Sequence, residues 1–286
     1  MISIIRLSQW LKNLLIFVVM FAANETNTDN FLILGIIFIG FSFLVSSTYI
    51  FNDLIDVESD RNHPVKKNRP LASGEITKET AIMLMLVLFI FGNAIIFYSN
   101  SSVLIYSSLY LFFTLLYTAK FKYVKYTDLI NISILFLIRI TIGGEAISTK
   151  ISIPLYIFVF FSSLAVVAGK KLSILGNSEI KNSKVKTFIK NSYSPEELKL
   201  ILNLSFVFSI VTYLYWLIQV KSFLVFNLNN LFLLISLISF LLFSSKFREN
   251  TYNSNTEEIV ITLINDKKLL IYLLMFGLSF FLGNII

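Results

Sequence analysis

The chain has 286 residues, of which 56% are hydrophobic and only 14% charged, and its mean hydropathy is +0.77. A soluble domain averages about 25% charged residues, so this composition nearly excludes a water-soluble enzyme and predicts that lipid surrounds most of the chain. With no Cys and one His, disulfides, thiolate zinc sites and a multi-histidine metal site within one chain are excluded. Any metal is expected to be a hard cation held by oxygen, such as Mg²⁺, Mn²⁺ or Ca²⁺.

Nine apolar segments are candidates for membrane-spanning helices, since a bilayer core of about 30 Å takes about 20 helical residues. In chain order they cover residues 9–23, 31–51, 79–98, 102–119, 128–148, 153–170, 200–219, 223–244 and 268–286. They predict an all-α integral membrane protein with about nine transmembrane helices bundled around a cytoplasm-facing cavity. A single transmembrane domain over residues 1–286 is expected, with Trp10 and Trp216 in the interfacial aromatic belts.

The distribution of Lys and Arg predicts the orientation. With the N-terminus in the cytoplasm, 21 of the 24 Lys and Arg residues fall on the cytoplasmic side. Lys150 and Lys221 fall on the outer side, and Arg139 lies within a helix. Because cytoplasmic loops are enriched in basic residues, we expect a multi-pass protein of the inner membrane with its chemistry on the cytoplasmic face. Topology accounts for the basic excess, so no nucleic-acid partner is expected.

The strongest local signal directly follows the second apolar segment, where the chain reads NDLIDVESD at residues 52–60. On a helix, Asn52, Asp53, Asp56 and Asp60 are expected to point the same way. Carboxylates gathered at a membrane boundary repel one another, and a divalent cation removes that cost. Because Mg²⁺ prefers a few carboxylates plus substrate phosphates, the pattern predicts a metal–diphosphate site. The alternative is a solvated acidic cap neutralised by nearby Lys and Arg.

Basic residues follow the acidic run in the segment RNHPVKKNRPLASG at residues 61–74. Lys66 and Arg69 are predicted to bind substrate phosphates, because Lys supplies a point charge and Arg a bidentate fork. The two Pro and the Gly predict a defined turn. His63 is expected to be a hydrogen-bonding loop residue rather than a general base.

This arrangement resembles the UbiA superfamily of intramembrane prenyltransferases. The pattern Asn52-Asp53-x-x-Asp56-x-x-x-Asp60 matches the first aspartate-rich motif of that superfamily, and NRPL followed by SG at residues 68–74 matches the sequence after it. The resemblance covers essentially the whole chain and includes the nine-helix architecture. It implies a Mg²⁺ cofactor, with Mn²⁺ as an alternative. Asp53, Asp56 and Asp60 are then expected to be catalytic, and Asn52, Asp56 and Asp60 to be metal ligands.

Further segments resemble the branch of this superfamily that contains decaprenyl-phosphate phosphoribosyltransferase. They are RLSQWLKN at 6–13, YIFND at 49–53, HPVKK at 63–67, YTAKFK at 117–122, Arg139 with Gly143 and Gly144, GKK at 169–171, and residues 258–266. That branch transfers phosphoribose from phosphoribosyl diphosphate to a polyprenyl phosphate and releases diphosphate. The resemblance therefore implies these two substrates, alongside membrane lipids.

One departure separates this chain from typical UbiA prenyltransferases, which carry a second aspartate-rich motif in the loop after the sixth helix. Here residues 170–179 read KKLSILGNSE, with one carboxylate and two adjacent Lys. Such a loop favours anions over a second set of metal ions. Two phosphorylated substrates would both need cations, whereas an aromatic acceptor would need fewer.

Five further residues are predicted to bind substrate: Lys12, Tyr49, Lys120, Arg139 and Lys170. Lys120 is preferred to Lys122 because it matches the superfamily's Lys most directly, although both can be membrane-interface anchors. Arg139 lies about 16 Å further along the helix than Asp128, a depth at which Arg needs a polar cavity. It is expected to reach a phosphate from beneath the cavity, or else to bond backbone carbonyls or Glu145.

Two other functions stay open at this point. One is an ordinary UbiA reaction, in which a prenyl group moves from prenyl diphosphate to an aromatic acceptor. The other is a transporter, disfavoured because the acidic run has no second copy and Gly and Pro rarely interrupt the helices. Lipid length and oligomeric state are not determined by the sequence.

Overall fold

The computed structural model of the chain describes residues 2–62, 66–177, 184–221, 227–256 and 259–285, and in these ranges it contains helices and no strand. The α-helices are α1 (Ile2–Ile5), α2 (Val18–Ala22), α3 (Thr28–Arg61), α4 (Pro70–Ser73), α5 (Lys78–Ser99), α6 (Val103–Ala119), α7 (Thr127–Ala146), α8 (Ile153–Gly176), α9 (Lys184–Ser192), α10 (Pro195–Lys221), α11 (Leu228–Tyr252), α12 (Ile259–Asn265) and α13 (Lys267–Ile285). The 3₁₀ helices are η1 (Leu7–Phe17), η2 (Lys66–Asn68) and η3 (Phe121–Tyr123).

Within the described residues, seven helices are long and apolar enough to cross a membrane: α3, α5, α7, α8, α10, α11 and α13. Two shorter apolar helices, Leu7–Ala22 and Val103–Ala119, coincide with the two remaining predicted segments. The prediction of an all-α, multi-pass integral membrane protein is confirmed. The count of nine crossings and the side on which the cavity opens stay predictions.

The first apolar segment is mostly a 3₁₀ helix, which is longer per residue than an α-helix. Its first 11 residues form η1, and α2 continues it to Ala22. Because a 3₁₀ helix rises about 2.0 Å per residue instead of 1.5 Å, this short segment extends about 30 Å, comparable to a bilayer core. It also lies directly against α7, since a Cβ atom on Gly143 would come 2.0 Å from the carbonyl oxygen of Ile16.

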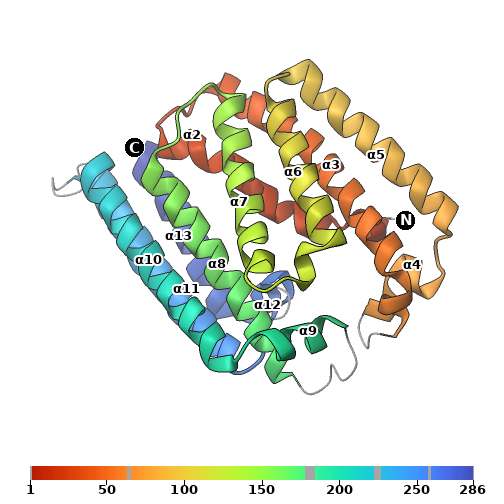
Figure 1. Ribbon diagram of the computed structural model, residues 1–286. Helices are drawn as coiled ribbons and strands as arrows, with labels where there is room; N and C mark the ends of the chain where they lie inside the picture. The colour runs from red at the N-terminus through yellow and green to blue at the C-terminus, as the bar shows by residue number, and fades with distance from the viewer. Residues whose placement is uncertain (1, 63–65, 178–183, 222–226, 257–258, 286) are drawn as a thin grey trace.

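The longer helices pack as neighbouring pairs, with α5 along α3, α10 along α8 and α13 along α11 (Figure 1). Two hydrophobic cores meet at α7, which contributes Leu129 and Ile140 to one and Leu135 and Ile138 to the other. This central position explains why α7 is buried on more than one face. It also places the polar side chains of α7 inside the bundle.

Trp216 does not lie in an interfacial belt, so that prediction is wrong. Its side chain is buried, and its ring stacks on Tyr213 and Phe280 with centroid separations of 5.9 and 5.8 Å. The aromatic cluster around α10 and α13 covers the indole, so packing within the bundle determines its position. Trp10 is half-buried and donates from Nε1 to Ser46 Oγ at 2.9 Å.

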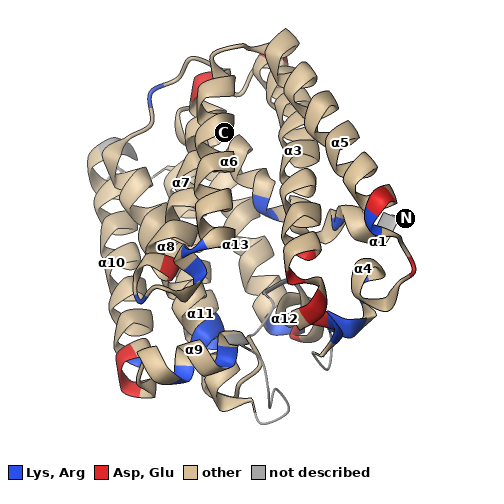
Figure 2. Cartoon of the chain, turned by 45° about the vertical axis from the view of Figure 1, so that its right-hand side comes forward, with Lys and Arg blue, Asp and Glu red and all other residues tan. Residues whose placement is uncertain are grey.

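Charged residues gather at the end of the bundle that carries α4, α9 and α12 (Figure 2). At 34 residues, α3 is about 51 Å long, so it outlasts a bilayer core of about 30 Å by several turns. Its last turns, from Asn52 to Arg61, carry the acidic run to this end. The acidic run therefore lies on the same helix as the second apolar segment, as the sequence predicts.

Candidate active site

A polar cavity of about 760 Å³ opens among α3, α6, α7, α8, α9, α11 and α12. Among the described residues, eight cationic side chains and two carboxylates line it. The cations are Arg6, Lys12, Lys66, Arg69, Lys122, Arg139, Lys170 and Lys171, and the carboxylates are Asp56 and Asp266. This excess of positive charge suits a ligand that carries several negative charges.

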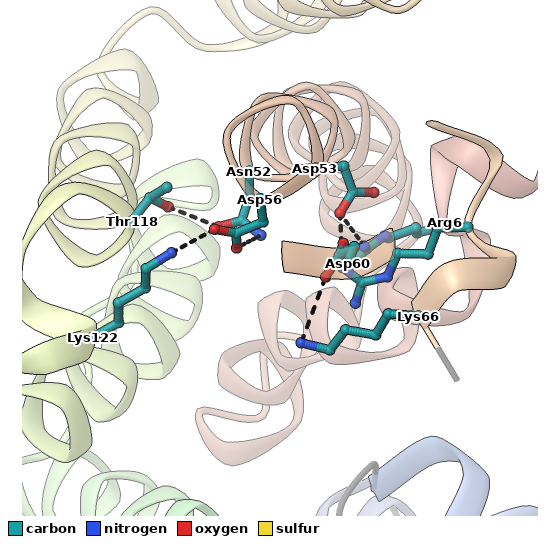
Figure 3. Close-up of polar contacts among 9 residues, drawn as sticks. Arg6, Asn52, Asp53, Asp56, Asp60, Lys66, Thr118 and Lys122 are labelled. Carbon is teal, nitrogen blue, oxygen red and sulfur yellow. Dashed lines mark hydrogen bonds and ion pairs between the residues drawn. The ribbon is translucent and has the colours of Figure 1, made fainter. Parts of the chain in front are cut away.

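Asn52 and Asp56 face the cavity from one side of α3 (Figure 3). Asn52 Nδ2 donates to Asp56 Oδ2 at 3.2 Å, and Lys122 Nζ lies 2.8 Å from Asp56 Oδ1. Thr118 Oγ1 donates to Asn52 Oδ1 at 3.3 Å. The end of α6 and the turn η3 therefore hold this pair of oxygen donors in place.

Asp53 and Asp60 face a different group of side chains. Arg69 Nη1 lies 3.1 Å from Asp53 Oδ1 and also pairs with Asp60 Oδ2, while Arg6 forms an ion pair with Asp53. Lys66 Nζ is 3.9 Å from Asp60 Oδ1. Both carboxylates have side chains that are 4% exposed, against 25% for Asp56. They form a buried ion-pair network behind the cavity rather than part of its lining.

The prediction that all four acidic-run residues point the same way is therefore wrong. At 100° per residue, Asn52, Asp56, Asp60 and Asp53 fall at about 0°, 40°, 80° and 100° around the helix. A spread of this size is enough to place the first two beside α6 and the last two beside η2 and the N-terminal segment.

The donor set fits a hard divalent cation in part. In the ranges that the structure describes, no group of three or more acidic or His side chains is arranged to hold a metal ion. Asn52 and Asp56 nevertheless present oxygen donors to a cavity large enough for a diphosphate, and Mg²⁺ commonly takes its remaining ligands from phosphates and water. Asp60 could become a metal ligand only if its ion pair with Arg69 opened.

Lys66 and Arg69 both line the cavity while they neutralise Asp60. Burial lowers the pKa of Lys66, and the neighbouring Arg69 acts in the same direction, whereas Asp60 and Asp56 oppose the shift. Lys66 is the first residue of η2, and Arg69 directly follows that turn. His63 lies outside the described residues, as does Glu258 near the C-terminus.

Arg139 is 2% exposed and lies at the floor of the cavity. It donates to Asn13 Oδ1 at 3.0 Å, to the Leu135 carbonyl at 2.7 Å and to the Tyr110 hydroxyl at 2.9 Å. A carbonyl contact was one expected alternative, but Glu145 is not among the partners found. The guanidinium thus joins η1, α6 and α7 and still borders the cavity, as do Lys12 and Tyr49.

The structure places Lys122, rather than Lys120, at the cavity. Lys120 is exposed and absent from the lining, because α6 ends at Ala119 and the 3₁₀ turn η3 brings Lys122 back toward Asp56. Family matching favoured Lys120, whereas the geometry of the cavity favours Lys122. Arg6, Lys171 and the buried Asp128 are also missed by sequence reasoning. Arg6 and Lys171 lay within the segments that carried the resemblance, which was the available signal.

Lys122→Gln is expected to lower kcat/KM for the anionic substrate bound beside Asp56 by about tenfold or more, because it removes a charge-assisted contact there. Lys120→Gln, at an exposed position two residues away, is expected to change it far less. Steady-state kinetics of the two purified variants provide the comparison. The opposite order of effects would favour Lys120 as the substrate ligand.

Together, the helical fold and the cavity define a multi-pass membrane protein with a cation-rich cavity at one end of the bundle. A model described as the UbiA prenyltransferase family matches residues 13–259. The chain belongs to this family and is a transferase.

Among curated proteins, a decaprenyl-phosphate phosphoribosyltransferase of Mycolicibacterium smegmatis is 30% identical over 221 residues, which are 76% of this chain and 69% of that protein. One of Mycobacterium tuberculosis strain CDC 1551 is 29% identical over 220 residues, 75% of this chain and 72% of that protein. Among solved structures, a UbiA homolog from Archaeoglobus fulgidus bound to DMAPP and Mg²⁺ matches with a TM-score of 0.67. It is 17% identical, and the match covers 98% of this chain and 96% of that one, which establishes a shared fold.

Proposed function

We propose that the protein transfers 5-phosphoribose from phosphoribosyl diphosphate to a polyprenyl phosphate and releases diphosphate. The observation that carries this proposal is the charge of the cavity, whose lining includes eight cations and two carboxylates in the part of the chain that the structure describes. Both proposed substrates are anionic, so each needs cations. The names of the two curated relatives support the same reaction.

The distribution of the cations favours this reaction over prenyl transfer to an aromatic acceptor. Lys66, Arg69 and Lys122 surround the acidic run, whereas Lys170 and Lys171 come from α8. A prenyl diphosphate and an aromatic acceptor would need fewer cations. Two phosphorylated substrates use both groups.

Asn52 and Asp56 would hold Mg²⁺. Asp60 would be a further ligand if its ion pair with Arg69 opens, and Asp53 would have a supporting role. The Mg²⁺ in the Archaeoglobus fulgidus homolog supports a divalent metal in this fold. When bound, the metal neutralises charge that develops on the departing diphosphate. Lys66, Arg69 and Lys122 bind the same diphosphate and fix its direction of departure.

The transfer breaks the bond between the anomeric carbon of ribose and the diphosphate oxygen. The carbon develops oxocarbenium character, and an oxygen of the polyprenyl phosphate attacks it from the opposite face. The electron pair of the broken bond leaves with diphosphate. Because the attacking oxygen is already anionic, no general base is required, which suits a chain with one His.

In the cell, the chain would act as one domain over residues 1–286 in the inner membrane, with its N-terminus and cavity on the cytoplasmic side. The Lys and Arg distribution supports this orientation. A soluble sugar phosphate would then enter from the cytoplasm, while the lipid tail reaches the cavity from the bilayer.

Purified protein, Mg²⁺ and labelled phosphoribosyl diphosphate provide the test. Label is expected to move into lipid when a polyprenyl phosphate is present, and EDTA is expected to stop the transfer. A parallel reaction contains labelled prenyl diphosphate and aromatic acceptors. Product in the parallel reaction alone would overturn the phosphoribosyl assignment and establish prenyl transfer instead.

A further inference from the structure

A buried cluster of three side chains lies in the wall of the cavity formed by α7, α8 and the segment after α9. It consists of Asp128 at the start of α7, Lys171 near the end of α8, and Tyr193 just before α10. Their exposed fractions are 0%, 6% and 4%. Lys171 and Asp128 form an ion pair, and the Tyr193 hydroxyl donates to Asp128 Oδ1 at 2.6 Å.

The two oxygens of the Asp128 carboxylate contact different groups. Oδ1 also accepts from the backbone N–H of Leu129 at 2.8 Å, and Oδ2 is the atom paired with Lys171. The backbone N–H of Tyr126 in turn donates to the Tyr193 hydroxyl at 2.6 Å. A carboxylate in this position fixes the orientation of the ammonium beside it.

Lys171 is a member of the cavity lining as well as of this cluster. Its ammonium lies over the rings of Phe188 and Tyr193, with centroid distances of 5.6 and 5.5 Å. An ammonium carries three N–H donors, and one carboxylate oxygen does not use all of them. Asp128 and the two rings therefore hold a charged donor group at the edge of the cavity.

The neighbours of Lys171 in the lining have the chemistry of a lipid phosphate site. Lys170 adds a second cation, and Val167, Ile174 and Ile189 add apolar surface from α8 and α9. A small anion needs the cations alone. A phosphate joined to a hydrocarbon chain uses both the cations and the apolar surface next to them.

Three other cations of the cavity already contact the acidic run. Lys66, Arg69 and Lys122 pair with the carboxylates of the acidic run, where the donor diphosphate is placed. Two anionic substrates bound side by side repel each other unless separate cations neutralise each one. The α8 wall supplies that second positive site.

We propose that Lys171 binds the phosphate headgroup of the polyprenyl phosphate acceptor, and that Asp128 and Tyr193 are positioning residues that hold its ammonium. This assignment rests on the proposed function and names the acceptor half of the same cavity. Lys170 assists from the adjacent position, and the first prenyl units lie against Val167, Ile174 and Ile189.

The test measures KM for each substrate separately in purified Lys171→Met, Lys171→Arg and Tyr193→Phe proteins. Lys171→Met is expected to raise KM for the polyprenyl phosphate by about tenfold or more, since it removes a charge-assisted hydrogen bond. KM for phosphoribosyl diphosphate stays within about twofold. Lys171→Arg restores part of the acceptor affinity, and Tyr193→Phe raises the acceptor KM by about threefold.

Lys190→Met is the matched control, because Lys190 is exposed on α9 and outside the cavity lining. It is expected to leave both KM values unchanged. Should Lys171→Met fail to fold, Tyr193→Phe carries the same test, since it removes one hydroxyl and keeps the ring.

Two results would overturn the assignment in distinguishable ways. An unchanged acceptor KM in Lys171→Met and Tyr193→Phe, or a rise confined to the phosphoribosyl diphosphate KM, rejects the acceptor site while the proposed function stands. Wild-type protein that transfers no phosphoribose to any polyprenyl phosphate rejects the proposed function, and the acceptor assignment falls with it.

Discussion

Asp56→Asn is expected to lower kcat/KM on the order of 10³-fold while the protein stays folded. Asp56 is the carboxylate of the acidic run that lines the cavity, and it lies beside Asn52 and Lys122. Replacing its charge by an amide removes the anionic oxygen ligand that would hold a diphosphate-bound metal ion. The loss is expected mainly in turnover, measured with saturating substrates and purified protein.

Folding is expected to survive this change because the Asp56 side chain is 25% exposed and Asn keeps its shape. Glu58→Gln is the matched control, since Glu58 is an exposed acid two residues further along α3 that pairs with Arg61. Its activity is expected to stay near that of the wild type. Nearly full activity in Asp56→Asn would eliminate the metal–diphosphate assignment.

Arg69→Met is expected to cost about 3–5 kcal/mol of stability, the largest structural effect in the site. Arg69 pairs with Asp53 and Asp60, whose side chains are each 4% exposed. Among the described residues, the two nearly buried carboxylates then keep Arg6 and the more distant Lys66 as ion-pair partners. Thermal unfolding in detergent, compared with the wild type under identical conditions, measures the loss.

A double-variant cycle identifies the cause of that loss. Arg69→Met combined with Asp60→Asn is expected to recover part of the stability, because neutralising one carboxylate removes part of the uncompensated charge. Lys67→Met is the control, as Lys67 lies in the same turn and is exposed. Equal stability of Arg69→Met and wild type would show that Arg69 serves substrate binding without supporting the fold.

The local sequence was sufficient to predict α3 and the cluster of charged side chains at its end. Its apolar run and its acidic run are contiguous, so one helix carries both, and the nearby Lys66 and Arg69 indicated an anionic ligand. It was not sufficient to predict that the run divides into two faces. Periodicity alone places Asp53 and Asp60 within 100° of Asn52, and only the positions of α6 and η2 determine which residues face the cavity.

For single cationic residues too, the local sequence predicted the charge but not the contacts. Lys120 and Lys122 have the same charge and lie two residues apart, but the turn η3 directs only Lys122 toward Asp56. Arg139 was recognised as unusual from its depth alone, but its two side-chain partners lie 126 and 29 positions away in the chain. Lys171 gave no local signal beyond a pair of Lys, because the buried Asp128 and Tyr193 that hold it belong to other helices and loops.

The sequence by itself determined that this is a helical membrane protein with its charge concentrated at one end, because hydropathy and basic-residue distribution depend on composition along the chain. It also determined the family, through residues that are contiguous in short motifs. The tertiary structure alone decided which charges neutralise one another and which line the cavity. Those are properties of side chains brought together from distant helices, and ion pairing depends on distances that no local pattern specifies.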